Sequence, residues 1–194
     1  MPTVRTFIAI ELTAEALRAL GQVQEKLRRS PGGQAGRWVR AEGIHLTLKF
    51  LGDVPEEKLP EVYQAVEQAC QGHQPFEVAF GGLGGFPNLR RPRVIWVGAE
   101  EESGQLQSLQ RDVEQALERK GFPRERRPFR PHLTLARVRK GASPSEAAAL
   151  GRSVAQAQVG TLGRMQVKEV SVMRSELTPE GALYSELYKV SLAP

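Results

Sequence analysis

Apolar side chains recur along this chain at two spacings, one typical of strands and one typical of helices. The clearest strand-like alternation occurs at residues 44–48 and 131–135, and both segments contain the tetrapeptide His-Leu-Thr-Leu. Successive side chains of a strand lie on opposite faces, so the leucines can enter a core while the histidine and the threonine share the other face. The pattern therefore predicts two strands that each present an imidazole and a hydroxyl away from the core.

The segments around these two strands repeat in one order: strand, helix, extended lead-in, His-Leu-Thr-Leu strand, helix, strand. The helices are predicted from apolar residues three and four apart, with cap residues or proline at their starts. Aligning the histidines gives an offset of 132 minus 45, or 87 residues, and the flanking elements stay in register at that offset. The predicted elements are strand 5–12, a helix capped by Thr13, a helix with Pro55 as its first residue, strand 75–80, strand 93–99, a helix from about Ser103, a helix capped by Ser143, and strands 161–175 and 183–192 around a turn at 178–181.

An internal duplication accounts for this repeated order. Pseudo-two-fold symmetry between the copies would let the two equivalent strands face each other and bring both His-Thr pairs to one groove. We therefore expect a single domain with two pseudo-equivalent halves, at approximately 1–90 and 91–194.

The glycine-rich stretch at 81–88 invites comparison with phosphate-binding loops. It lacks the Gly-Lys-Ser/Thr end of a P-loop and the spacing of a dinucleotide fingerprint, and Pro87 does not suit a helix that continues from it. We interpret this stretch as a flexible or tightly turning connection between strands.

Composition narrows the class of protein. With 194 residues, 40% of them hydrophobic, the chain can bury a core without disulfides or a metal ion. The single cysteine, Cys70, excludes an internal disulfide and a multi-cysteine zinc site, which suits a reducing cytosol. The start has no signal-peptide layout, and no apolar run approaches the length of a membrane span. These features predict a cytoplasmic protein without membrane attachment, with a monomer as the default.

The balance of charge favours an anionic partner. The formal net charge is +5, which is a weak indication of nucleic acid because many small basic proteins bind none. A basic cluster brackets the second His-Leu-Thr-Leu strand, and it fits a solvated surface as well as an RNA-backbone track. The cluster consists of Arg124, Arg126, Arg127, Arg130, Arg137, Arg139 and Lys140.

Paired histidines with threonine partners suit acid–base chemistry on a phosphate ester. Imidazole, with an ordinary pKa of about 6.5, can accept or donate a proton near neutrality. A lone histidine on a strand is usually structural, but two matched His-Thr pairs favour a catalytic function. The motif is a poor metal-ligand pattern because it has no second histidine, carboxylate or thiolate at fixed spacing. The third histidine, His73, follows Gly72 in a predicted turn, and we interpret it as an exposed residue without a catalytic function.

Four aromatic residues lie near the motifs or in the strands that flank them. Trp38, Phe50 and Phe129 fit either core packing or stacking on a terminal base. Trp96 lies inside an apolar strand, and we assign it to the core.

The two motifs, within residues 44–54 and 129–137, resemble those of the 2H phosphoesterase superfamily. More narrowly, they resemble the RNA 2',3'-cyclic phosphodiesterases of bacteria and archaea, long called 2'-5' RNA ligases. Residues 5–10, 92–98 and 177–184 are also similar to that group, so the resemblance spans nearly the whole chain. It implies a bilobal, duplicated α+β fold, in which two antiparallel sheets with flanking helices surround a central groove that holds the active site.

The resemblance also implies an activity and roles for particular residues. The implied reaction is the hydrolysis of a 2',3'-cyclic phosphate at an RNA end to a 2'-phosphate, without a metal or other cofactor, and tRNA fragments or small cyclic nucleotides are further candidate substrates. His45 is then the proton donor and His132 the acceptor. Thr47 and Thr134 hydrogen-bond the phosphate oxygens.

The two motifs differ at one position. Arg137, five residues past His132, matches a phosphate-binding arginine of the second motif, whereas Phe50 stands at the corresponding place in the first. The site is therefore expected to be asymmetric. Two alternatives stay open, namely joining of RNA ends through a 2'-5' linkage and a non-catalytic RNA-binding module whose histidines only contact phosphate.

Overall fold

The structure is a computed structural model that describes residues 1–193. Its strands and helices alternate along the chain much as the hydrophobic pattern predicts. In chain order they are β1 (Thr3–Glu11), α1 (Ala14–Arg28), the 3-10 turn η1 (Gly33–Ala35), β2 (Gly36–Trp38), η2 (Ala41–Gly43), β3 (His45–Pro55), η3 (Glu56–Lys58), α2 (Leu59–Cys70), β4 (Phe76–Phe86), β5 (Val94–Glu100), α3 (Gln105–Arg119), β6 (His132–Val138), α4 (Pro144–Gln156), β7 (Thr161–Val167), β8 (Glu169–Thr178) and β9 (Gly181–Ser191).

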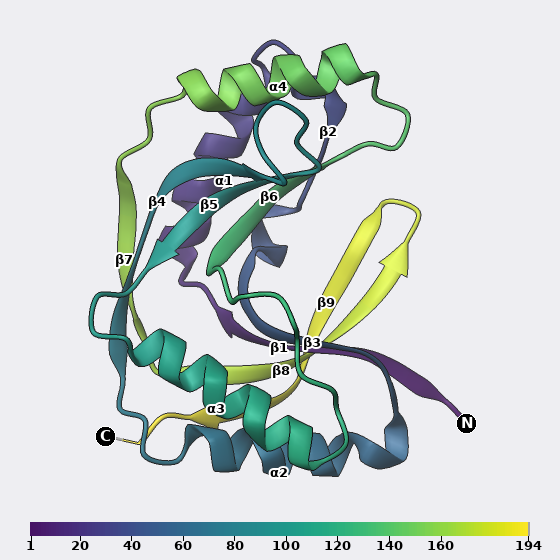
Figure 1. The fold of residues 1–194 in the computed structure, drawn as a ribbon, viewed down its shortest axis with the longest axis vertical. Coiled ribbons are helices and arrows are strands. Elements are labelled where there is room, and N and C mark those ends of the chain that lie inside the picture. Colours follow the sequence, from purple (N-terminus) through teal and green to yellow (C-terminus); the bar gives the residue numbers. More distant parts are fainter. Residues whose placement is uncertain (194) are drawn as a thin grey trace.

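The elements form two lobes, each an antiparallel sheet backed by two helices (Figure 1). The lower lobe in this view has the strand order β3-β1-β8-β9 and is covered by α2 and α3. The upper lobe has the order β2-β6-β5-β4-β7 and is covered by α1 and α4. This arrangement confirms the bilobal α+β fold that the resemblance implies.

The pairing of the motif strands repeats between the lobes. β1 pairs with β3 as β5 pairs with β6, and every residue number in the second pairing exceeds its counterpart by 87. A bulge interrupts both pairings at the equivalent place, between Ile8 and Ala9 and between Ile95 and Trp96. The two motifs therefore have the same local geometry. The opposed residues are Glu11 with His45 and Ala9 with Thr47 in the lower lobe, and Gly98 with His132 and Trp96 with Thr134 in the upper lobe.

Each lobe nevertheless draws on both ends of the chain. β8 and β9 complete the sheet that begins with β1 and β3, whereas α1 and β2 belong to the upper lobe. Helix α3, which follows β5, packs instead against α2 and β3 of the lower lobe. Most of the buried apolar residues of both lobes form one contiguous cluster, and Phe7, Ala9 and Met173 form a second, small cluster against which Tyr184 packs. None of the helices within residues 1–193 is long and apolar enough to cross a bilayer.

The predicted helix caps at Thr13 and Ser143 are confirmed. The Thr13 hydroxyl accepts a hydrogen bond from the backbone N–H of Ala16, and Ser143 forms a reciprocal capping box with Glu146. The helix start predicted at Pro55 is wrong, because Pro55 is the last residue of β3 and α2 begins only after a 3-10 turn.

The interpretation of the glycine-rich stretch as a connection is also wrong. β4 continues through these glycines to Phe86, paired with β5. At Gly84 a Cβ atom would lie 2.2 Å from the Trp96 ring, so the absent side chain makes room for the indole. Glycine here permits close packing on a strand. The predicted strand 161–175 is likewise two strands, β7 and β8, in different sheets.

Candidate active site

The two motif histidines are held by the same local contact. Nδ1 of His45 lies 2.7 Å from the Gly43 carbonyl oxygen, and Nδ1 of His132 lies 2.6 Å from that of Arg130. A carbonyl can only accept a hydrogen bond, so Nδ1 must carry the proton in each ring. Nε2 is then the nitrogen that each imidazole can offer to a substrate.

His45 is packed among aromatic rings. Phe7 stacks on it with ring centroids 4.6 Å apart, and Tyr184 meets it edge-on at 4.9 Å. Burial lowers the pKa of His45 from 6.5 to about 4, against the smaller, opposite effect of the hydrogen bond to Gly43. The ring is therefore neutral at pH 7 in the protein without substrate.

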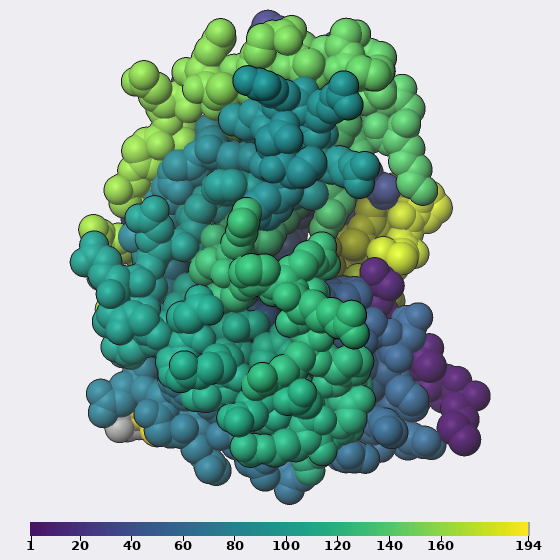
Figure 2. Space-filling model, viewed as in Figure 1, coloured from purple at the N-terminus to yellow at the C-terminus, as the bar shows by residue number. Residues whose placement is uncertain are grey.

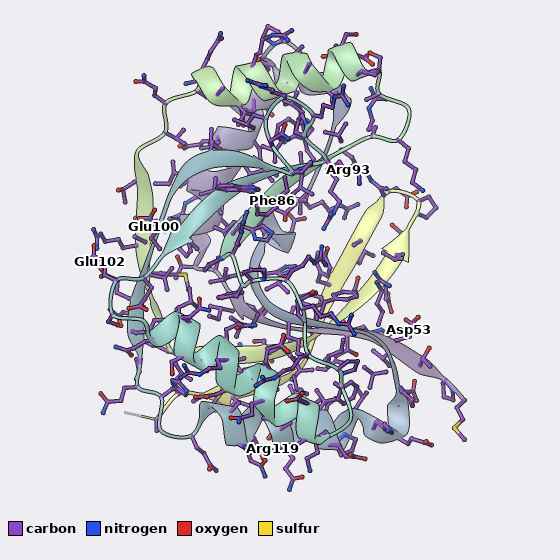
Figure 3. The ribbon with its side chains drawn as sticks, viewed as in Figure 1. Asp53, Phe86, Arg93, Glu100, Glu102 and Arg119 are labelled. Carbon is purple, nitrogen blue, oxygen red and sulfur yellow. The ribbon has the colours of Figure 1, made fainter. Side chains whose placement is uncertain are left out.

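His132 has an aromatic neighbour of its own. The Phe86 ring meets it edge-on at 4.9 Å, and Phe86 also packs against Trp96 with centroids 5.3 Å apart. Phe86 extends from β4 on the side of the upper lobe that faces the lower one (Figure 3). The assignment of Trp96 to the core is wrong, because Trp96 is only partly buried and lies opposite Thr134 on the same face of the sheet.

Contacts between the lobes bring the two motif strands close together. Cα atoms of β3 and β6 approach to within 8 Å. Burial raises the pKa of Tyr184, and the positive charges of Arg137 and Arg5 partly oppose this rise. Arg137 of the upper lobe thus acts on a lower-lobe tyrosine that touches His45, so the two lobes approach each other at this point.

The threonines, and the two residues five positions past the histidines, Phe50 and Arg137, lie where the motifs predict. Thr47 and Thr134 are both half-buried, and each lies two residues past its histidine, on the same face of the strand. Phe50 lies opposite Phe7 in the place that corresponds to Arg137 in the upper lobe, and it is 50% exposed. The two motifs thus present an aromatic ring in the lower lobe and a guanidinium in the upper lobe at equivalent positions.

The sequence did not single out three residues of the aromatic cluster around His45 and Phe50. These residues are Phe7, Tyr184 and Arg5, and the guanidinium carbon of Arg5 lies 4.7 Å from the centroid of the Phe50 ring. Phe7 and Arg5 lie in the segment 5–10, whose similarity to the family was the one available signal. Tyr184 lies in the segment 177–184, which carries the same similarity, and it reaches the site from β9, which pairs with β8 and not with either motif strand.

The basic cluster is only partly free to bind an anion. Arg124 pairs with Glu118 at 3.0 Å, and Arg127 pairs with Glu125 at 3.3 Å. The segment between α3 and β6, which carries much of the cluster, crosses the front of the molecule between the lobes (Figure 2). Arg130 contributes the carbonyl that holds His132.

Two aromatic residues near the motifs, Trp38 and Phe129, pack against the core. The Trp38 indole N–H donates to the Gly33 carbonyl at 3.0 Å, and Phe129 packs on the same apolar cluster.

His73 was predicted to be exposed, which is wrong. Its side chain is 12% exposed and its Nε2 lies 2.7 Å from an Asp112 oxygen, so it links the end of α2 to α3.

No group of three or more histidine, cysteine, aspartate or glutamate side chains within residues 1–193 is arranged to hold a metal ion. The two imidazoles are the candidate acid–base groups, with Thr47, Thr134 and Arg137 as candidate partners for an anionic substrate.

Comparison with known proteins places the chain in a family. The model of the 2'-5' RNA ligase superfamily matches residues 8–178. An RNA 2',3'-cyclic phosphodiesterase of Methanothermobacter thermautotrophicus is 37% identical over 184 residues, which cover 95% of this chain and 96% of the relative. A crystal structure of a Thermus thermophilus protein superposes with a TM-score of 0.79 at 32% identity and 97% coverage of both chains. E. coli LigT complexed with 3'-AMP superposes with a TM-score of 0.77 at 26% identity and 99% coverage of both. The chain belongs to the 2'-5' RNA ligase superfamily.

Proposed function

We propose that this protein hydrolyses the 2',3'-cyclic phosphate at RNA ends to a 2'-phosphate, with His45 and His132 as the acid–base pair and without a metal ion. The observation that carries the proposal is the equivalent placement of the two imidazoles, each with Nδ1 bonded to a backbone carbonyl and Nε2 left for a substrate. The relatives named RNA 2',3'-cyclic phosphodiesterase and the 3'-AMP bound by LigT support a nucleotide substrate.

In the proposed reaction a water molecule attacks phosphorus while the bond from phosphorus to the ribose O3' breaks. One histidine takes a proton from the water through Nε2, and the other donates a proton to the departing O3'. The product carries a 2'-phosphate and a free 3'-hydroxyl, so all atoms are accounted for. Thr47, Thr134 and Arg137 would donate hydrogen bonds to the nonbridging oxygens, where negative charge develops.

The burial of His45 affects which histidine can donate the proton to the departing O3'. The resemblance assigns the donor role to His45, which must then be protonated, although its pKa of about 4 favours the neutral ring in the free protein. A bound phosphate carries negative charge, and a nearby negative charge raises the pKa of a histidine. We therefore propose that His45 takes up its proton only in the complex with substrate.

The test is turnover of an RNA oligonucleotide that ends in a 2',3'-cyclic phosphate, in the presence of excess chelator. We expect hydrolysis at the rate seen without chelator, with a 2'-phosphate as product. Replacement of His45 or His132 by alanine should lower kcat by about a hundredfold or more, because each removes one proton-transfer group.

His73→Ala is the matched control, because it removes a histidine that lies away from the groove and should leave kcat unchanged. Loss of activity in chelator would contradict the metal-free mechanism. Tight RNA binding without turnover at any pH would favour the binding module, and joining of ends in place of hydrolysis would favour the 2'-5' ligation reaction.

A further inference from the structure

Two arginines lie side by side on the groove face of the upper lobe. β2 pairs with β6 so that Arg37 is directly opposite Arg137. Directly opposed residues of an antiparallel pair project from the same face, with Cβ atoms about 4.5 to 5.5 Å apart. Arg37 therefore belongs to the same surface as the candidate phosphate-binding residue Arg137.

Opposed like charges destabilise a sheet unless something neutralises them. Within residues 1–193, no carboxylate lies within the 4.0 Å limit for an ion pair with either guanidinium, although several other arginines of the chain are paired in this way. Both side chains are exposed to solvent. An unneutralised arginine pair beside a candidate active site is the arrangement expected of an anion-binding surface.

The position of Arg37 separates it from the reacting phosphate. Along β6 the groove face runs from His132 through Thr134 to Arg137, and Arg37 lies one strand further out at the edge of the sheet. One of its terminal nitrogens lies 3.5 Å from the Pro179 carbonyl oxygen, in the turn of the β8–β9 hairpin of the other lobe. Figure 1 shows the tip of this hairpin, in yellow, rising toward the upper lobe.

We infer that Arg37 binds the phosphodiester that links the last two nucleotides of the RNA, one phosphate away from the cyclic phosphate between the histidines. This inference rests on the proposed function. Arg137 then contacts the terminal phosphate, and Arg37 contacts the next one as the strand leaves the groove between β2 and the hairpin. The enzyme would consequently favour RNA ends over free nucleoside 2',3'-cyclic phosphates.

The test compares two substrates, a nucleoside 2',3'-cyclic phosphate and a dinucleotide ending in the same group, because only the dinucleotide has a linking phosphate. Arg37→Ala should lower kcat/KM for the dinucleotide by about tenfold or more, mainly through KM, and leave the mononucleotide unchanged. For the dinucleotide, log(kcat/KM) falls as log(salt) rises, and in the variant this slope should be less steep by about one unit or slightly less. Arg37→Lys should keep part of this salt dependence.

Arg152→Ala is the matched control, because it removes one exposed arginine from α4, outside the groove, and should change neither substrate. Thermal unfolding of each variant shows whether the contact with Pro179 has a structural effect. Equal losses on both substrates would overturn the inference by placing Arg37 on the reacting phosphate, and no loss on either would overturn it too. If the wild-type protein hydrolysed neither substrate, the proposed function would fail. The inference about Arg37 would then be tested separately, by comparing how tightly the wild-type protein and Arg37→Ala bind a dinucleotide that ends in a 2'-phosphate.

Discussion

Burial and aromatic packing set His45 apart from His132, although the two have equivalent backbone surroundings. The Phe7 and Tyr184 rings that exclude water from His45 stabilise its neutral form. His132 touches one ring, that of Phe86. A duplicated motif has thus acquired two different environments, which is what two proton-transfer groups with opposite tasks require.

The lowered pKa of His45 predicts a pH dependence of stability. In the unfolded chain its pKa is about 6.5, so between about pH 6.5 and pH 4 the unfolded state binds a proton that the folded state does not. The free energy of unfolding should therefore fall as the pH is lowered through this window. In His45→Asn this contribution is absent, so the variant should lose less stability than the wild-type protein. Urea denaturation of both at several pH values measures the difference, and parallel losses would contradict the assigned cause.

Single residues were predictable where the signal was local. The shared strand face of each histidine and its threonine was predictable because a strand fixes which side chains lie on one face. The contact of Tyr184 with His45 was not predictable, although the segment 177–184 resembles the family, since Tyr184 reaches His45 from β9. Trp96 was misassigned because an apolar run does not reveal which of its residues face a groove.

Among the elements, the segment between α3 and β6 is anchored by a buried ion pair. Lys49 of β3 lies 2.6 Å from Glu114 of α3, with their side chains only 3% and 9% exposed. Lys49 also donates to the Pro123 carbonyl at 2.8 Å, and the Glu125 backbone N–H donates to Glu114 at 3.3 Å. The pair thus fixes the start of the segment that leads to His132.

Breaking this pair should destabilise the protein strongly. Lys49→Met leaves the Glu114 carboxylate buried without its partner, at a cost of about 3 to 5 kcal/mol in the free energy of unfolding. Lys49→Met combined with Glu114→Gln should recover part of that loss, because no buried charge remains. Urea denaturation measures both.

The exposed pair Arg124–Glu118 supplies the control for this prediction. Its side chains are 48% and 51% exposed, so Arg124→Ala should cost less than about 1 kcal/mol. A similar cost for Lys49→Met would mean that water reaches Glu114.

Helices and strands were predictable to the extent that local chemistry determines them. Cap residues marked the starts of α1 and α4, since side-chain and backbone groups a few residues apart satisfy each other there. The glycine stretch was misread because the reason for Gly84 is the Trp96 ring of the neighbouring strand, which only the pairing of β4 with β5 reveals.

For the molecule as a whole, the 87-residue repeat predicted the pairing of the motif strands but not how the lobes exchange elements. α1 packs on the upper lobe and α3 on the lower, so each copy of the repeat covers the sheet of the other. β8 and β9 come from the second copy and complete the sheet of the first beside β1, whereas β4 of the first copy lies beside β5 in the sheet of the second. Such exchange depends on contacts between distant parts of the chain, which periodicity along the sequence does not report.

This exchange predicts that neither half of the chain folds alone. Residues 1–90 contain β1 and β3 without β8, β9 and α3, and residues 91–194 lack β4, which joins β5 to β7. Each half would therefore expose apolar surface that the main core, shared by both lobes, normally buries. We expect each half, expressed separately, to show no cooperative thermal unfolding by circular dichroism, and the two expressed together to recover a folded complex. Recovery in the mixture is the control for the chain break itself, which falls in the connection between β4 and β5. A half that melted cooperatively by itself would show that the lobes had kept the independence of their duplicated ancestor, and that the core they share contributes little to folding.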